Sequence, residues 1–139
     1  MQPVRISTRE EYEVAVRAGI EPLMDARCRM DHALRVEVQR EKFGRGNHEE
    51  NNIRFYRWMW DHRPHLCEEC LRPLLDYSAV HISHIESRGN GPAMAYDPRN
   101  VNILCLRCHN TWENGDRRRM RIYRRNAMTL EQLRKEYED

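Results

Sequence analysis

The sequence has no long apolar run, and no internal repeat or low-complexity segment. No uninterrupted apolar stretch approaches the ~20 residues that a helix needs to cross a bilayer. The opening residues, MQPVRISTREEYE, also lack the apolar core of a secretory signal. We therefore expect a cytoplasmic protein with no membrane partner.

The chain is short and polar, with little apolar material for a core. It has 139 residues, of which 33% are charged and 40% hydrophobic, and its mean hydropathy is −0.94. This length supports one compact domain, or a small domain with a helical extension. A core of this size is the kind that a bound metal ion supports.

The five cysteines are arranged for metal binding. Cys67/Cys70 and Cys105/Cys108 each have the C-x2-C spacing that brings two thiolates to one zinc ion, and four such ligands complete a closed structural site. Without an export signal, this pattern favours zinc over disulfides. Cys28 is left over, and we expect it to be a buried apolar thiol.

Lysine is scarce, since arginine supplies 22 of the 24 cationic side chains. The net charge of +2 proves no partner, but residues 86–125 hold nine Arg against four acidic residues, a local charge of +5. The planar guanidinium matches phosphate oxygens in pairs, so this bias suits nucleic acid. The alternative is that these charged side chains form a solvent-exposed face of the protein without binding a partner.

Residues 1–64 are predicted to form a helical arm. A capping box at Ser7 and Glu10 is expected to start a first helix that Gly19 ends. A second helix is expected over residues 22–43, because the apolar residues recur at spacings of seven and four, and a third over residues 48–61. Residues 44–47 separate the last two helices. The arm is either a buttress for the rest of the chain or, through its second helix, a dimer or DNA-docking surface.

The remaining chain alternates between strand and helix patterns. Strands are predicted over residues 77–85 and 100–104, with a loop rich in turn residues at 87–98 between them. A helix is expected to start at the second cysteine pair and to end at Gly115. A basic segment covers 117–125, and the Thr129/Gln132 pair is expected to cap a last helix over residues 130–138.

Residues 67–115 resemble the HNH endonucleases. Between and after the cysteine pairs lie His84 at the end of a strand-like run, Asn100 after a Pro-Arg turn, and His109 next to the last cysteine. The resemblance implies an α+β protein in which a ββα-metal module at residues 65–116 is stapled by zinc. The helical arm at 1–64 precedes this module, and the basic segment and C-terminal helix at 117–139 follow it.

The family's motif assigns roles to these residues. His84 matches the general base, and a neutral imidazole is suited to take a proton from water near pH 7. Asn100 matches the residue that ties the loop to the strand and orients the base. His109 matches a metal ligand. Glu113 stands where many members have a second His, and helical spacing puts it on the face of His109.

Ser83 departs from the family pattern. Members usually place Asp or His directly before the base as a metal ligand, and Ser is a poor one. In a strand, His81 would share the face of Ser83, and phage Holliday-junction resolvases resemble this arrangement. We therefore expect His81 as the substitute ligand; the alternative is that it packs on the sheet. The catalytic ion is expected to be Mg²⁺ or Mn²⁺, with Ni²⁺ and Zn²⁺ as alternatives.

The expected function is metal-dependent hydrolysis of DNA. One alternative is a zinc-stapled DNA-binding module without catalysis, which Ser83 favours. Another is a dimeric resolvase of branched DNA that associates through the arm. The phosphate contacts are expected from the basic side chains around the site: Arg88, Arg107, Arg117, Arg118, Arg119, Arg121, Arg124 and Arg125.

Overall fold

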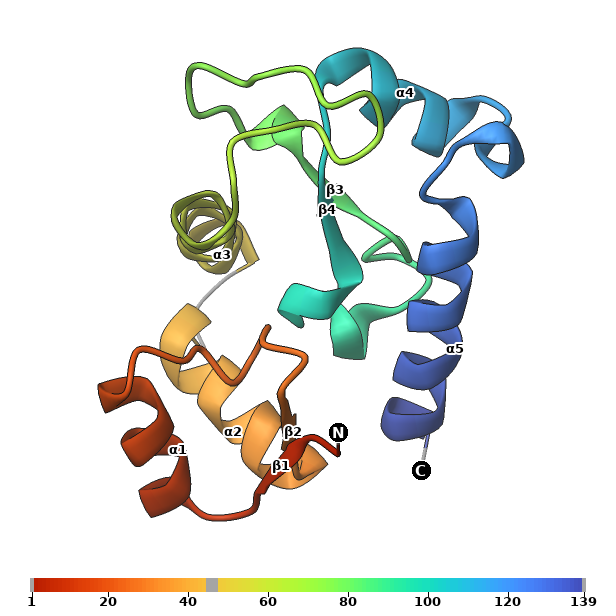
Figure 1. The fold of residues 1–139 in the computed structure, drawn as a ribbon. Coiled ribbons are helices and arrows are strands. Elements are labelled where there is room, and N and C mark those ends of the chain that lie inside the picture. The colour runs from red at the N-terminus through yellow and green to blue at the C-terminus, as the bar shows by residue number, and fades with distance from the viewer. Residues whose placement is uncertain (1, 45–47, 139) are drawn as a thin grey trace.

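The fold is centred on a short β-hairpin followed by a helix. In the computed structural model, which describes residues 2–44 and 48–138, β3 (Ile82–His84) pairs in antiparallel fashion with β4 (Val101–Ile103), and α4 (Leu106–Asn114) follows directly. Ser83 lies opposite Asn102 in the hairpin register. This is the expected ββα unit, and it lies in the middle of the molecule (Figure 1).

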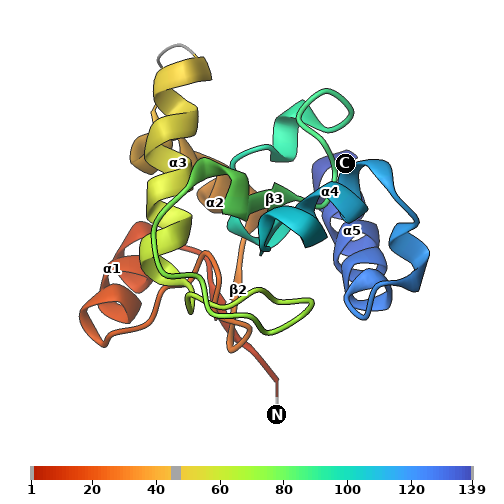
Figure 2. The ribbon, with the colours of Figure 1, turned by 90° about the horizontal axis from the view of Figure 1, so that it is seen from above.

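Helices from the two ends of the chain flank the hairpin. Helix α3 (His48–His62) lies on one side, and α5 (Tyr123–Glu138) lies on the other in both views (Figures 1 and 2). Short 3-10 turns at Ala79–His81, Pro92–Met94, Pro98–Asn100 and Arg117–Arg119 connect the elements. All three residues of β3 and all three of β4 are buried, so both faces of this small sheet are covered.

Helix α1 (Arg9–Arg17) begins one residue later than its sequence pattern predicts. Thr8 is the N-cap, and its hydroxyl accepts a hydrogen bond from the backbone N–H of Glu11. In turn, the Glu11 carboxylate accepts a hydrogen bond from the backbone N–H of Thr8. The capping box therefore consists of Thr8 and Glu11, because Ser7 follows directly on strand β1 (Val4–Ile6). Gly19, at φ +85°, follows the end of the helix as expected.

The predicted second helix over residues 22–43 is wrong in its first part. Residues 28–30 form strand β2 (Cys28–Met30), which pairs in parallel with β1, and helix α2 (His32–Phe43) starts only after it. Before the strand, the Asp25 carboxylate accepts from the backbone N–H of Arg27 at 2.9 Å. Such a local side-chain bond competes with the helical ladder, so this segment turns where its apolar spacing suggests a helix.

Three other predicted boundaries need correction. Residues 79–81, expected in the first strand, form a 3-10 turn, and the returning strand is shorter than residues 100–104. Helix α5 starts at Tyr123, within the predicted basic segment, so Thr129 and Gln132 lie inside it and do not cap it. The cause is tertiary, because buried Asn126, in the first turn of α5, donates to the Asn102 side chain at 2.7 Å.

The core joins the arm to the module. The buried apolar side chains of α2 and α3 form one cluster with those of the hairpin and the cysteine loops. Cys28 is only partly buried against this cluster. Gly44 caps α2 at φ +100°, and the rest of the predicted break, residues 45–47, lies outside the described residues. No helix of the described part is both long and apolar enough to span a bilayer.

Candidate metal and nuclease site

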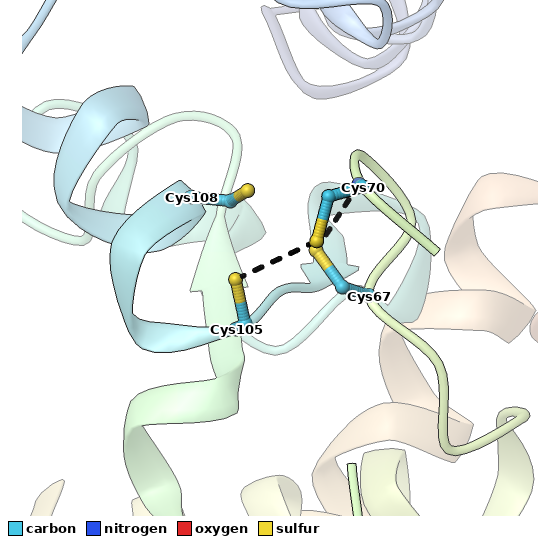
Figure 3. Close-up of side chains that lie close together, drawn as sticks. All are labelled: Cys67, Cys70, Cys105 and Cys108. Atoms are coloured by element: carbon cyan, nitrogen blue, oxygen red, sulfur yellow. Dashed lines mark hydrogen bonds between the residues drawn. The ribbon is translucent and has the colours of Figure 1, made fainter. Parts of the chain in front are cut away.

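Two loops bring the four predicted cysteines together. Cys67 and Cys70 come from the loop after α3, whereas Cys105 and Cys108 come from the N-terminus of α4 (Figure 3). All four sulfur atoms lie within 4.8 Å of one another. Tetrahedral zinc with Zn–S bonds of about 2.3 Å needs S···S separations of about 3.8 Å, and the Cys70 and Cys105 sulfurs are 3.8 Å apart. The donor set and its spacing fit a structural zinc ion.

The two glutamates between the first cysteines fix this loop to its neighbours. Glu68 accepts from the Ile103 backbone N–H of β4 at 2.6 Å and forms an ion pair with Arg63 at 3.1 Å. Glu69 accepts from the backbone N–H groups of Arg121 and Ile122, just before α5. The Cys67–Cys70 loop is therefore bonded to the hairpin, to the end of the arm and to the C-terminal segment.

The His84 side chain has a defined tautomer. It is 8% exposed, and its Nε2 lies 2.8 Å from the carbonyl oxygen of Ala95. A carbonyl oxygen can only accept, so Nε2 carries the proton and Nδ1 is left as the basic nitrogen. Burial lowers the pKa of His84 more than this hydrogen bond raises it, which favours the neutral ring. The ring also stacks on Phe55 of α3, at 6.0 Å between centroids.

Asn100 links the hairpin to the long loop between its strands. Its side chain is fully buried; Oδ1 accepts from the Glu86 N–H at 2.9 Å, and Nδ2 donates to the carbonyls of Glu86 and Met94 at 3.1 and 3.3 Å. The Asn100 carbonyl also accepts from Ile85, the residue after β3. One side-chain amide therefore links the start of the loop, at Glu86, to Met94, the residue before the Ala95 carbonyl that His84 contacts.

His109 and Glu113 form a pair on α4. The Nδ1 of His109 donates to the Val80 carbonyl at 2.6 Å, so its Nε2 carries the lone pair. That nitrogen lies 3.6 Å from Oε1 of Glu113, one turn further along the helix. A metal-binding histidine commonly donates its other N–H to a backbone carbonyl in this way. Two such atoms are close enough to share one divalent ion, and the negative charge of Glu113 acts to raise the pKa of His84.

His81 and Ser83 each carry a buried polar atom without a partner. His81 lies in the 3-10 turn, so strand alternation does not place its side chain on the face of Ser83. Its Nδ1 makes no hydrogen bond, and burial, together with the nearby His109, lowers its pKa. Ser83 is fully buried and its Oγ is likewise unpaired. Among the described residues, only the four cysteines form a group of three or more close ligand side chains.

The arginines predicted to contact phosphate differ in their surroundings. All except Arg117 are exposed, and Arg117 lies over the Trp112 ring at 4.6 Å. Arg118 and Arg119 both pair with Asp116, whereas Arg125 forms a 2.6 Å ion pair with Glu68. The remaining side chains, Arg88, Arg107, Arg121 and Arg124, are exposed as well, and the charge of Arg88 acts on His84.

Several residues around this site carry no motif in the sequence. Val80 and Ala95 act through their backbone carbonyls, which every residue type offers. Asp97 is fully buried between two arginines. Glu68 could have been noticed in the sequence, because it lies inside the first C-x2-C pair. Its position there did not show which four residues donate hydrogen bonds to its carboxylate: Arg63, Asn102, Ile103 (through its backbone N–H) and Arg125.

Comparison with known proteins identifies this part of the chain. Neither the comparison with curated proteins nor the comparison with solved structures finds a match. A family model described as HNH endonuclease matches residues 67–115. This range begins at the first cysteine of the four-cysteine cluster, contains β3, β4 and α4, and ends just after the helix that carries His109. Residues 67–115 are therefore an HNH domain by their match to this family model, and the rest of the chain lies outside the match.

Proposed function

We propose that the chain is a metal-dependent endonuclease that hydrolyses DNA phosphodiester bonds with His84 as the general base. The observation that carries this is the pair of opposed tautomers. Ala95 fixes His84 with its basic nitrogen at Nδ1, and Val80 fixes His109 with its lone pair at Nε2. One ring is thus prepared to accept a proton, and the other to bind a cation beside it.

The residues of the site have separate roles in the proposed reaction. His84 takes a proton from the attacking water, and Asn100 keeps the loop that orients His84 in place. His109 and Glu113 would hold a divalent ion, and His81 would have to move closer to both to serve as a third ligand in place of Ser83, because the three do not form a close ligand group here. When bound, this ion supplies positive charge at the scissile phosphate and at the leaving oxygen. A carboxylate beside an imidazole suits Mg²⁺ or Mn²⁺.

The exposed arginines extend the site along the nucleic acid. Arg88 follows the strand that carries His84, and Arg107 lies within the second cysteine pair. Arg118 and Arg119 are exposed on the turn after α4, and Arg117 beside them lies over the Trp112 ring. Contacts of this kind fix the position of the phosphate backbone but read no bases.

A DNA-binding domain without catalysis is the second candidate function. Ser83 favours it, because a buried hydroxyl is a weak metal ligand in a position where the family usually has Asp or His. In that case the zinc module and the arginines would bind DNA without cleaving it.

Nicking of supercoiled plasmid separates the two functions. Wild type is compared with His84→Ala in EDTA, Mg²⁺, Mn²⁺, Ni²⁺ and Zn²⁺. His62→Ala is the matched control, because the His62 ring stacks on Trp58 at 4.0 Å and its Nδ1 donates to the Trp58 carbonyl, both within α3. We expect metal-dependent nicking by wild type and His62→Ala, and none by His84→Ala with its zinc retained. Absence of nicking by folded, zinc-loaded wild type with every metal would leave the binding function.

A further inference from the structure

The turn that supplies the hydrogen-bond partner of His84 is itself tied down from outside the HNH motif. In the turn from Met94 to Asn100, the Ala95 carbonyl accepts a hydrogen bond from His84 Nε2, and the Met94 carbonyl accepts one from the side-chain amide of Asn100. Asp97 lies in the chain between Ala95 and Asn100. Its N–H donates to Met94, and its carbonyl accepts from the Asn100 N–H at 2.9 Å. The conformation at Asp97 therefore sets both contacts.

The Asp97 carboxylate is fully buried and has three partners. Oδ1 accepts from Arg35 Nη1 at 3.3 Å, and Oδ2 accepts from Tyr137 at 2.8 Å. Arg99 donates to both oxygens through its side chain, and its backbone N–H donates to Oδ1. Arg35 belongs to α2 of the arm and Tyr137 to α5, so elements from opposite ends of the chain meet on one carboxylate.

Arg35 is also anchored within the arm. It is 3% exposed, and its guanidinium donates to the carbonyls of Leu23 and Pro22 at 3.0 and 3.4 Å. Its position is thus set by the turn before β2 and by Asp97 together. An arm that only covered apolar surface would not need to bury an arginine, because taking a charge out of water costs free energy unless a partner compensates.

We propose that Asp97 is a positioning residue for His84, and that Arg35 of the arm and Tyr137 of α5 hold it in place. They fix the turn so that the Ala95 carbonyl meets Nε2 and leaves Nδ1 as the basic nitrogen. The arm is then part of the catalytic apparatus. This inference rests on the proposed role of His84 as base.

The experiment compares variants that loosen Asp97 to different degrees. Tyr137→Phe removes only the hydroxyl, and Arg35→Met removes the charge from the arm, whereas Arg35→Lys keeps it. Ile6→Ala is the matched control, because it opens a cavity in the arm's core at a residue that is 2% exposed, while all the partners described for the Asp97 carboxylate stay in place. All variants are assayed at a temperature at which each is folded and holds its zinc.

The proposal predicts a loss in kcat without a change in KM for DNA. We expect kcat to fall at least tenfold in Arg35→Met and severalfold in Tyr137→Phe, with partial recovery in Arg35→Lys. Ile6→Ala should keep the wild-type kcat. Equal kcat values in Arg35→Met and Ile6→Ala would overturn the proposal, because they would show that the arm contributes stability alone.

A second measurement does not depend on nuclease activity. The ring nitrogens of His84, observed by ¹⁵N NMR, report which nitrogen carries the proton and whether it is hydrogen-bonded. We expect the Nε2–H signature in wild type and Ile6→Ala, and its loss or a tautomer mixture in Arg35→Met. An unchanged signature in Arg35→Met would contradict the positioning role. Wild type that shows the signature but does not nick DNA would count against the proposed function only.

Discussion

The imidazole Nε2 of His109 lies 3.6 Å from the Glu113 carboxylate, one turn further along α4. The Val80 carbonyl accepts a hydrogen bond from the Nδ1–H of His109, so the lone pair on Nε2 lies towards Glu113. Glu113 stands where the related motif often has His, and an acidic oxygen changes the preference of the site towards harder cations.

Removal of the Glu113 carboxylate should weaken binding of the catalytic ion. We expect Glu113→Gln to raise the Kd for Mn²⁺ about tenfold or more, since a charged ligand is replaced by a neutral one. Titration calorimetry or the electron paramagnetic resonance of Mn²⁺ measures this without any cleavage assay. Glu131→Gln, an exposed change on α5, is the control. Equal Mn²⁺ affinities in the two variants would remove Glu113 from the metal site.

Loss of a zinc-binding cysteine should unfold the HNH domain. Structural zinc contributes about 10–16 kcal/mol in small zinc domains, and the net stability of a domain is only about 5–15 kcal/mol. We therefore expect Cys67→Ser to lose its zinc and the cooperative unfolding transition. Cys28→Ser, whose thiol is outside the cluster, should keep one zinc per chain. Metal analysis and thermal unfolding followed by circular dichroism provide the readouts.

The buried Asp97 should make stability depend on acid pH. Burial by itself raises its pKa, but the charges of Arg35 and Arg99 and the hydrogen bonds from Arg99 outweigh burial and lower it. A lowered pKa in the folded state stabilises the fold above the unfolded pKa of about 3.9, and this contribution is lost as pH falls through the folded value.

Asp97→Asn tests this dependence. It leaves Arg35 without its charge partner, so we expect a loss of about 3–5 kcal/mol in the free energy of unfolding near pH 7. The difference from wild type should start to shrink as pH falls below about 4, where the carboxylate of the unfolded chain becomes protonated, and should shrink further as pH falls through the lower pKa of the folded state. Denaturant unfolding at several pH values measures it, with exposed Asp76→Asn as control. A difference that stays constant with pH would show that the charge of Asp97 contributes nothing.

The arginines after α4 should contribute to the salt dependence of DNA binding. Within the part of the chain that the structure describes, Arg118 and Arg119 pair only with exposed Asp116; such surface pairs are weak, so both are available for phosphates. Replacing Arg117, Arg118 and Arg119 by Ala should lower the slope of log K against log salt by about 2–3. Arg125 is tied to Glu68, so Arg125→Ala should change the slope less and stability more. Fluorescence anisotropy at several salt concentrations distinguishes these outcomes.

The sequence by itself determined the metal-binding character of this protein. The C-x2-C spacing brings two thiolates together within one turn of chain, so the zinc site needs only two short segments to meet. The order of His84, Asn100 and His109 is likewise visible without a fold, and the concentration of apolar and aromatic residues in 48–61, after the break at 44–47, was enough to predict α3. These signals can be read from residue types and their order along the chain, without knowing which segments meet in space.

Only the tertiary structure decided the segments whose partners are distant. Residues 28–30 became a strand because β1 lies beside them, and α5 extends back to Tyr123 because Asn126 pairs with Asn102. The tautomers of His84 and His109 depend on the carbonyls of Ala95 and Val80, and a backbone carbonyl leaves no mark in the sequence. The three partners of Asp97 come from α2, its own turn and α5, so no spacing along the chain could have shown that they meet.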